Sequence, residues 1–530
     1  MYRSLSPIAH RRIRRRRAGA DAHGRPARVG RPLAWACLLA GLLLALDSAA
    51  ASGSAYSLTA LREMAAAGAP GLALRRLDEG QPVAEQAPAA WARWERARVQ
   101  VLARAGARRA ALERLAAPPP AAPDSFRRWA LARRSELHLE LGEAALARAL
   151  ARELIWRAGA GAASGELRAW RRVVVRSYLV GDRIADAVTA LRRFDQDYRD
   201  ASTAWAILRT RVLLRGDRPA EAADRLPSDA TDELRALGLL ARLRSERLES
   251  AVVGRRAREA AVHEETAPAD AARYWFVAAA AARARSVPGI NALATEQGAV
   301  HAGALPAADT VFRLGGDALW SAWLERGTAF GNEQRLLIGD HDAWFRAAAD
   351  SLPEYPVRAR SLLAVIALRG EGAAATAAHR RLLELLAGED APGVVVARRA
   401  YLHSSRFPAL ARVPEIVRYR LVDDALRRDD LDLATRLMQA LPEAPGDVGA
   451  FAWRLLRARV LVLGGRREAG VAALEALLSD APDLRGRALD RFLQVVFDLQ
   501  GARAHEVALQ LLQRLAERDL PGQRRRELLY

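Results

Sequence analysis

The sequence predicts an all-α fold of antiparallel helix pairs that stack along the chain, the architecture of an α-solenoid. A unit recurs, because Trp170 and Trp205 are each followed eleven residues later by Gly-Asp-Arg, which places the two copies 35 residues apart. A third copy, from Trp453 to Gly464, keeps the same internal spacing. Ala, Leu and Arg dominate the composition, and almost no stretch alternates with the period of two that a half-buried strand requires.

Each copy has the pattern of two amphipathic helices joined by a tight turn. In the first copy, the residues that share one face of the first helix are Trp170, Val173, Val174 and Ser177. The residues that share one face of the second helix are Ala187, Leu191, Phe194 and Tyr198. At the turn, Gly181 is expected to take the left-handed conformation, and Asp182 to accept hydrogen bonds from the N–H groups that open the next helix. One pair cannot hide both apolar faces, so a repeat of about 35 residues predicts that neighbouring pairs stack.

Residues 1–51 are predicted to be a signal peptide with an extended basic region and are excluded from the fold. Arginine-rich sequence precedes an apolar run of 14 residues, Leu33 to Leu46, which is shorter than the roughly 20 residues that span a membrane. We therefore expect export, with cleavage near Ala51 or Ala55 and a periplasmic or secreted location. The alternative is an uncleaved membrane anchor that holds the repeats in the periplasm. Cys37, the only cysteine, lies in this run, so the mature chain would form no disulfide.

The net charge of +20 does not indicate a nucleic-acid site. Residues 1–51 hold ten arginines against two aspartates and contribute +8, so +12 remains in residues 52–530. All 82 basic residues are arginines, and they are spread along every helix pair. The aromatic interleaving that is typical of single-strand binders is missing, so we expect a solvated basic surface and no nucleic-acid partner.

Beyond the leader, the regularity of the turns divides the chain into three regions. Residues 52–285 are predicted to form N-terminal helical repeats, with turns at Gly106, Gly142, Gly181 and Gly216 that lie 36, 39 and 35 residues apart. Residues 286–355 are predicted to be an irregular helical junction, because prolines and a Gly-Gly pair interrupt the periodicity. Residues 356–530 are predicted to form C-terminal repeats, since turn-like sequences recur there at intervals of 36 residues.

The units resemble tetratricopeptide repeats. In the third copy the matching positions of the family's aromatic, leucine, turn and two small residues are Trp453, Leu456, Gly464, Ala469 and Ala476. The resemblance implies a tetratricopeptide-like right-handed superhelix that binds other proteins. The long Ala-rich array also resembles the non-catalytic superhelix of soluble lytic transglycosylases, which implies a similar shape without the reaction.

No catalytic, cofactor-binding or metal site is predicted, and the protein is not expected to be an enzyme. Without lysine there is no P-loop or Schiff-base lysine, and without cysteine after the leader there is no thiol nucleophile or cysteine zinc site. The densest polar cluster, Asp340-His341-Asp342, is interpreted as a turn whose aspartate caps the helix that carries Trp344.

Seven of the twelve tryptophans are predicted packing positions. Trp170, Trp205 and Trp453 are expected to be buried wedges between helices. The pairs Trp91 and Trp94, and Trp320 and Trp323, each lie three residues apart and are expected in the core, with exposure of one ring to a partner as the alternative.

A tetratricopeptide array binds its partners on the face lined by the first helix of each pair. Carried over through each tryptophan, the family pattern predicts inward-facing side chains at Arg168, Arg171, Tyr178, Thr203, Thr210, Phe451 and Arg454. Guanidinium groups favour carboxylates and phosphates as ligands. The predicted ligand is therefore an acidic peptide segment or an anionic envelope glycan.

The leading functional hypothesis is an exported scaffold or adaptor that mediates protein–protein interactions in the bacterial cell envelope, with other envelope proteins as partners. The alternative is a non-catalytic binding or assembly factor for an envelope glycan, such as peptidoglycan or an exopolysaccharide. Recovery of defined protein partners would favour the scaffold, and retention on purified glycan would favour the alternative.

Overall fold

The computed structural model describes residues 57–517, apart from 159–162, 228–229, 307–308, 388–391, 429, 447, 482–483 and 502–504. The predicted leader, including Cys37 and the cleavage region at Ala51 to Ala55, lies outside the described residues. The described residues form 25 α-helices and no strand, which confirms the all-α prediction. None of these helices is both long enough and apolar enough to cross a membrane.

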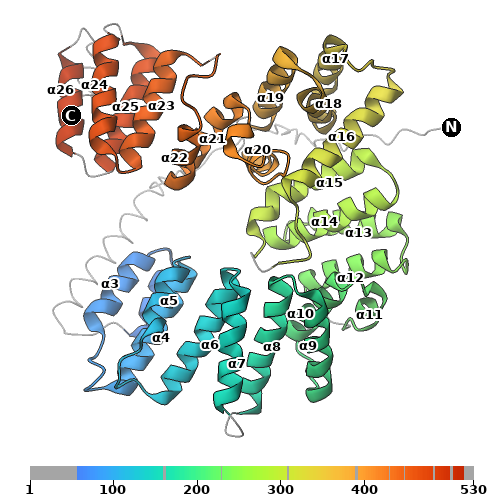
Figure 1. Ribbon diagram of the computed structural model, residues 1–530, viewed down its shortest axis with the longest axis vertical. Helices are drawn as coiled ribbons and strands as arrows, with labels where there is room; N and C mark the ends of the chain where they lie inside the picture. The colour runs from blue at the N-terminus through green and yellow to red at the C-terminus, as the bar shows by residue number, and fades with distance from the viewer. Residues whose placement is uncertain are drawn as a thin grey trace, which may run out of the picture. The chain divides into compact units, whose positions relative to one another are not determined.

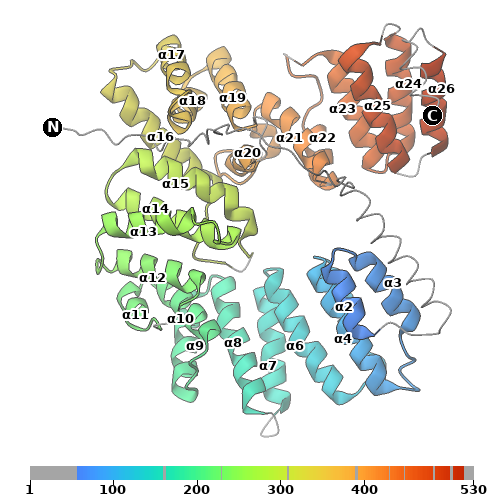
Figure 2. The ribbon, with the colours of Figure 1, turned by 180° about the vertical axis from the view of Figure 1, so that it is seen from behind.

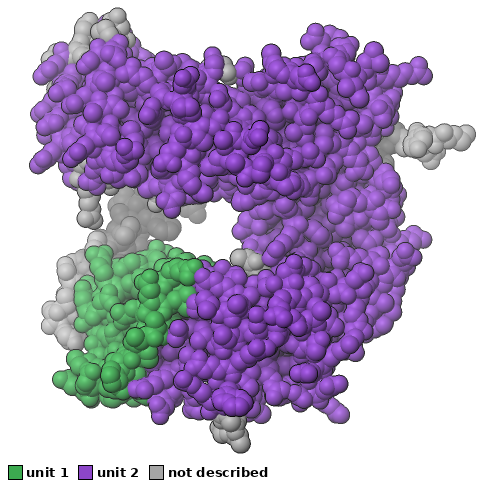
Figure 3. All heavy atoms as spheres, viewed as in Figure 1, with its two compact units in different colours: residues 1–123 green, residues 124–530 purple. Residues whose placement is uncertain are grey.

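The chain folds into two compact units, residues 1–123 and residues 124–530 (Figure 3). The described helices of the first unit are α2 (Leu58–Ala66), α3 (Pro70–Gly80), α4 (Pro88–Arg104) and α5 (Arg108–Ala116). They form two pairs, and α2 also contacts α4. Leu61, Leu77 and Val101 meet in the core between them.

The second unit continues with pairs in which a first helix is followed by a second helix. The first helices are α6 (Asp124–Glu140), α8 (Ser164–Val180), α10 (Thr203–Arg215), α12 (Asp232–Arg244), α14 (Pro268–Ala284), α16 (Gly316–Glu333), α18 (Pro356–Arg369), α21 (Glu415–Arg427), α23 (Ala450–Leu463) and α25 (Gly486–Gly501). The second helices are α7 (Ala144–Ala158), α9 (Ile184–Asp197), α11 (Pro219–Asp224), α13 (Ser250–Ala261), α15 (Pro288–His301), α17 (His341–Ser351), α19 (Gly372–Leu386), α22 (Leu431–Gln439), α24 (Arg467–Asp480) and α26 (His505–Ala516). Three elements stand outside this alternation: α20 (Pro392–Leu402) and the short 3₁₀ helices η2 (Ala302–Ala304) and η3 (Leu410–Arg412).

Within the second unit, successive pairs pack against one another along the chain. Within pairs, α6 contacts α7, α8 contacts α9, and α23 contacts α24; between pairs, α10 contacts α12, α12 contacts α14, and α23 contacts α25. Figures 1 and 2 show these pairs following one another in chain order. The apolar side of one pair is therefore covered by its neighbour, as the periodicity predicts.

Nine first helices among the described residues end in turns that are closed in one recurring way, whereas α18 does not, because Gly370 and Glu371 after it have φ values of −78° and −121°. The second residue after the last helical residue has a positive φ, and this residue is Gly68, Gly106, Gly142, Asp182, Asp217, Glu246, Ser286, Arg335 or Gly465. The residue that follows it donates its N–H to a carbonyl five residues earlier, at 2.8 Å from Glu143 to His138 and at 2.9 Å from Arg466 to Leu461. This is the Schellman arrangement, which satisfies carbonyl groups at a helix end.

The predicted roles of Gly181 and Asp182 are wrong by one residue. Gly181 has a φ of −81°, whereas Asp182 is the left-handed residue, with a φ of 57°. Asp182 does not cap α9, because the N-cap residue is Arg183, which makes no side-chain capping hydrogen bond. A glycine is needed at 181 because a Cβ there would lie 3.1 Å from the Cβ of Ala144 on α7, so the missing side chain lets α8 approach α7.

Two of the three predicted wedges are buried. Trp170 and Trp205 lie in the core, and the ring of Trp205 packs against Phe194 of α9 with 3.9 Å between centroids. Trp320 and Trp323 are also fully buried, in an edge-to-face arrangement.

The prediction for Trp453 is wrong, because this side chain is only partly buried and its indole N–H has no hydrogen-bond partner among the described residues. The preceding second helix explains the difference. α9 extends to Asp197 and supplies Phe194, whereas α22 is nine residues long and ends at Gln439.

Candidate functional site

The strongest candidate site is a pocket on the side of the molecule where successive first helices meet. We term this surface, which carries Arg211, Glu233 and Arg459, the first-helix face. The pocket has a volume of about 380 Å³ and lies among α21, α23 and α25. Its lining comprises Tyr419, Arg420, Asp423, Val448, Gly449, Ala452, Leu455, Leu456, Arg459, Arg491, Gln494 and Val495, and we term it the α21–α25 pocket. Its volume falls within the range of about 300–1,000 Å³ that is usual for ligand pockets.

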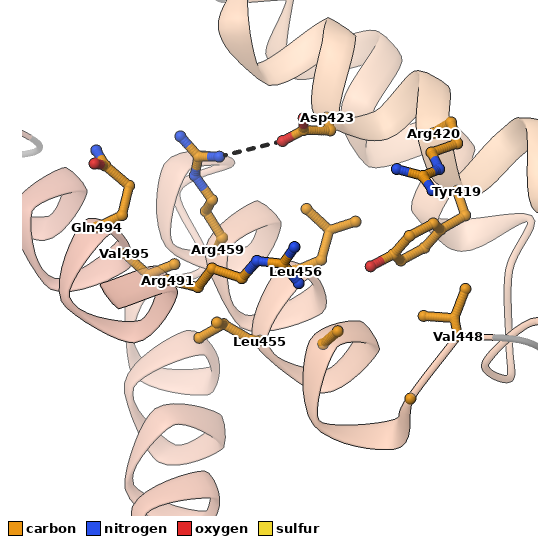
Figure 4. A pocket seen from close by; sticks show the side chains of 12 residues that line it. Tyr419, Arg420, Asp423, Val448, Leu455, Leu456, Arg459, Arg491, Gln494 and Val495 are labelled. Carbon is orange, nitrogen blue, oxygen red and sulfur yellow. Dashed lines mark ion pairs between the residues drawn. The ribbon is translucent and has the colours of Figure 1, made fainter. Parts of the chain in front are cut away.

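The repeat itself positions these side chains. Tyr419, Leu455 and Arg491 are spaced by 36 residues, so they occupy the same position of three successive first helices. In Figure 4, the α21 side chains lie on one side of the pocket and the α25 side chains on the other, with the α23 side chains between them. Leu455 and Val495 are buried and form an apolar floor.

One arginine of the pocket is already neutralised. The Nε of Arg459 donates to Asp498 on α25 at 2.5 Å, and its Nη1 lies 3.5 Å from a carboxylate oxygen of Asp423 on α21, the ion pair drawn in Figure 4. Arg459 therefore links three successive first helices. A guanidinium that has two carboxylate partners has little remaining affinity for an external anion.

Two other arginines are not neutralised. Arg420 and Arg491 are exposed at the pocket, and neither makes an ion pair or a side-chain hydrogen bond within the described part of the chain. Tyr419 stands beside them, and burial raises its pKa above the usual value, so its hydroxyl stays protonated and can donate a hydrogen bond. The pocket thus offers cations and a phenol over an apolar floor, a combination suited to a ligand with an anionic group next to an apolar side chain.

The structure does not bring the predicted site residues together. Arg168 and Arg171 lie over the ring of Tyr198, at 5.8 and 5.5 Å from its centroid, and Arg171 is also paired with Asp197. Tyr178 accepts a hydrogen bond of 2.6 Å from Arg152.

The remaining predicted residues are equally dispersed. Thr203 is exposed, Phe451 is partly buried against the core of the last helices, and Arg454 forms an ion pair of 2.7 Å with Asp480. The prediction that Thr210 faces a partner is wrong, because its side chain is 2% exposed and its hydroxyl donates to the carbonyl of Ala206. Thr210 lies five residues after Trp205, on the side of α10 that packs into the core.

Sequence reasoning missed Arg420 and Arg491, although a signal was present. Arginine recurs six residues after each tryptophan of the three repeat copies, at Arg176, Arg211 and Arg459. Of these, Arg459 lines the pocket. Composition hid this signal, because arginine is frequent on every helix.

The polar cluster at Asp340 is a helix cap, as predicted. The side chain of Asp340 accepts a hydrogen bond of 3.0 Å from the N–H of Ala343, and Trp344 is buried one residue further on. Within the described residues, no group of three or more His, Cys, Asp or Glu side chains is placed to hold a metal ion.

No protein-family model matches the sequence, and no curated protein matches it either. The protein is therefore defined here by its architecture and site. It belongs to the class of all-α proteins made of stacked helix pairs, with an arginine-rimmed pocket on its first-helix face.

Proposed function

We propose that the protein is an exported scaffold of the bacterial cell envelope, built as a tetratricopeptide-like right-handed superhelix, which binds other envelope proteins in the α21–α25 pocket. The observation that carries this proposal is the pair of unpaired guanidinium groups, Arg420 and Arg491, beside the apolar floor of Leu455 and Val495. Stacked helix pairs present first helices as an extended binding surface, and such surfaces bind segments of other proteins.

The proposed export rests on the leader sequence, with its basic region and the apolar run Leu33 to Leu46. N-terminal sequencing of the protein from the native cell tests this part of the proposal. A mature terminus near Ala51 or Ala55 in the periplasmic or secreted fraction is the expected result. A chain in the membrane fraction that retains its leader would favour the anchored form.

Affinity capture from envelope extracts tests the binding site. The test variant is Arg420→Ala with Arg491→Ala, and the matched control is Arg255→Ala with Arg346→Ala, which removes two exposed arginines from α13 and α17. The unchanged protein and the control should recover the same defined partners, and the test variant should lose them. Equal recovery by all three proteins would contradict the assignment of the pocket.

A second candidate function, binding of an anionic envelope glycan, is favoured by one observation. Trp156 on α7 is 88% exposed, and one turn before it Arg152 donates to the hydroxyl of Tyr178. Arg148 lies over the same tyrosine ring, 4.6 Å from its centroid. Exposed aromatic faces stack on sugar rings, and guanidinium groups bind carboxylates, so this patch suits an acidic polysaccharide.

Cosedimentation with purified peptidoglycan and with an acidic polysaccharide distinguishes the two functions. If the protein is a glycan-binding factor, Trp156→Ala should release it from the glycan, and Arg420→Ala with Arg491→Ala should not. If the protein is a scaffold, it should remain in the supernatant with peptidoglycan and with the acidic polysaccharide.

A further inference from the structure

One part of the first-helix face is occupied by the chain itself. Between η2 and α16 the backbone runs without a helix, and the described residues 309–312 of this segment are buried against α10 and α14. We term residues 309–314, Asp-Thr-Val-Phe-Arg-Leu, the internal segment. It shows which groups this surface accepts from a non-helical segment that turns at Val311 and Phe312.

The carboxylate of the internal segment is held by arginines of two first helices. Asp309 is 3% exposed, and one of its oxygens accepts from Arg211 of α10 at 3.0 Å and from Arg273 of α14 at 3.3 Å. Its other oxygen accepts from the backbone N–H groups of Val311 and Phe312, each at 3.3 Å. A buried carboxylate needs such partners, because unpaired burial of a charge is costly.

The backbone and the aromatic side chain of the segment are recognised as well. Arg215 donates to the carbonyl of Thr310 at 2.8 Å, so a guanidinium group also binds the main chain of the segment. The ring of Phe312 is 1% exposed and meets Phe276 of α14 edge to face, with 5.5 Å between centroids. The recognised order is therefore a carboxylate followed three residues later by an aromatic side chain.

The α21–α25 pocket repeats the chemistry of this occupied surface. Arg459 stands six residues before the left-handed Gly465, and Arg211 stands six residues before the left-handed Asp217. Both guanidinium groups reach a carboxylate of the next first helix, Arg211 to Glu233 at 2.7 Å and Arg459 to Asp498 at 2.5 Å.

The two surfaces differ in where an incoming carboxylate can be held. The second contact of Arg211 is with Asp309 of the internal segment, whereas the second contact of Arg459 is with Asp423 of α21. An incoming carboxylate would therefore meet the unpaired Arg420 and Arg491 instead, and the apolar floor of Leu455 and Val495 remains open to a ring.

We propose that the α21–α25 pocket binds a turn-forming segment of a partner protein in which a carboxylate side chain precedes an aromatic side chain by three residues, the order found in the internal segment. This inference rests on the proposed scaffold function and names the class of segment that the same site takes. In the internal segment the chain turns because the Asp309 carboxylate accepts from the N–H groups of Val311 and Phe312, while the carbonyl of Thr310 and the ring of Phe312 are held by α10 and α14.

The probe for this proposal is a fluorescent peptide with the sequence of residues 309–315, blocked at both ends so that the Asp309 carboxylate is its only anionic group. Its binding to the purified protein is followed by fluorescence anisotropy. We expect saturable binding that weakens about tenfold or more in the Arg420→Ala, Arg491→Ala variant, because each of the two substitutions removes charge-assisted hydrogen bonds to the peptide carboxylate. The Arg255→Ala, Arg346→Ala control should bind within about twofold of the unchanged protein, since both positions lie on other helices.

Peptide variants test the two recognised groups separately. Replacement of the peptide's Asp309 by Asn and of its Phe312 by Ala should each weaken binding, and replacement of Arg313, which is exposed in the structure, should not. Absence of saturable binding would overturn the proposal. Binding that is unchanged by Arg420→Ala with Arg491→Ala but lost in Arg211→Ala would also overturn the proposal. The peptide would then be replacing the internal segment between α10 and α14.

The outcome is separable from that of the proposed function. If envelope partners are captured through the pocket but the peptide does not bind, the scaffold function stands and the class of segment is wrong. If an acidic polysaccharide binds in a manner that depends on Arg420 and Arg491, and the peptide does not, the occupant is a glycan and the inference fails.

Discussion

At the scale of single residues, Trp205 shows how one side chain joins two helix pairs. Its ring is fully buried against Phe194, and its indole N–H donates to Asp195 at 2.9 Å, so both its apolar body and its polar group are satisfied by α9. The same carboxylate oxygen of Asp195 accepts from Arg209 at 2.9 Å. Trp205 is therefore a packed wedge with a fixed orientation.

Truncation of this wedge should be costly. We expect Trp205→Ala to lower the free energy of unfolding by roughly 3–5 kcal/mol, because a large cavity is left between α9 and α10. Trp156→Ala, at a ring that is 88% exposed, is the matched control and should change it by no more than about 0.5 kcal/mol. Urea unfolding followed by circular dichroism measures both, and a loss under about 1 kcal/mol at Trp205 would show that the ring is not a wedge.

His379 should make the stability depend on pH. Its side chain is buried, its Nδ1 lies 2.8 Å from the hydroxyl of Tyr401, and burial lowers its pKa to about 4. The unfolded chain, with a histidine pKa near 6.5, binds the proton more readily between these two values. The stability contributed by the neutral ring is therefore complete above about pH 6.5 and is lost as the pH falls towards 4.

Comparison of the protein with its His379→Asn variant isolates this contribution, since the asparagine amide can replace Nδ1 without titrating. Between pH 7 and 4.5 the unchanged protein should lose on the order of 2–3 kcal/mol more stability than the variant. Urea titrations at the two pH values provide the measurement. Parallel losses in both proteins would mean that His379 does not remain neutral on folding.

At the scale of elements, the Schellman turn fixes where nine of the described first helices end. Glycine occupies the left-handed position at Gly106, Gly142 and Gly465, but Glu246 has a φ of 57° at the same position. A side chain in this conformation costs about 1–2 kcal/mol, which a glycine avoids.

Glu246→Gly should therefore stabilise the protein by about 0.5–1 kcal/mol, after the larger entropy of glycine in the unfolded chain is subtracted. The same substitution in the last turn of α13, Glu259→Gly, where the residue is helical, should destabilise it by up to about 1 kcal/mol. Thermal unfolding of the two variants tests the turn. Equal destabilisation by both would contradict the left-handed assignment of Glu246.

A buried ion pair links the region that the sequence predicts to be an irregular junction, residues 286–355, to α18 of the predicted C-terminal repeats. Glu296 of α15 accepts from the indole N–H of Trp323 on α16 at 2.6 Å and from Arg360 of α18 at 3.1 and 2.5 Å. Removal of one partner leaves the other charge buried, which costs more than the pair gains.

Arg360→Met should lower the free energy of unfolding by roughly 3–5 kcal/mol. Addition of Glu296→Gln to that variant should recover part of the loss, because a neutral amide can still accept from Trp323. Arg381→Met breaks an exposed pair with Glu384 and should cost no more than about 1 kcal/mol. A loss at Arg360 no larger than that of Arg381 would show that the Glu296 pair is solvated.

The sequence predicted helix pairs and their spacing because apolar periodicity and turn residues are local signals. It misassigned Gly181, since a left-handed turn and a close approach to Ala144 both select a residue with a small side chain or none. Trp453 was misassigned because burial of a ring depends on the length of the preceding helix.

The pocket was missed for a related reason. An arginine-rich composition gives no hint of which guanidinium groups lack a partner: Arg420 stands three and four residues before Asp423 and Asp424, yet these carboxylates pair with other arginines. The internal segment was likewise hidden, because Asp309 meets Arg211 across 98 residues of sequence.

At the scale of the whole molecule, the large positive charge is organised by pairing between helices. Arg211, Arg273 and Arg459 are each held by carboxylates of neighbouring elements. Arginines paired in this way have little charge left for an external anion, so the unpaired Arg420 and Arg491 are the groups that an anionic partner would meet at the pocket. Partner binding is therefore expected at the α21–α25 pocket.

In-cell photo-crosslinking shows whether partner proteins contact this pocket. A photoreactive amino acid replaces the exposed pocket residue Gln494, and the control position is the exposed Arg346 of α17. We expect position 494 to crosslink to one defined set of envelope proteins, position 346 not to do so, and Arg420→Ala with Arg491→Ala to abolish the products. Crosslinks that are equal at both positions, or that persist without the two arginines, would contradict the account.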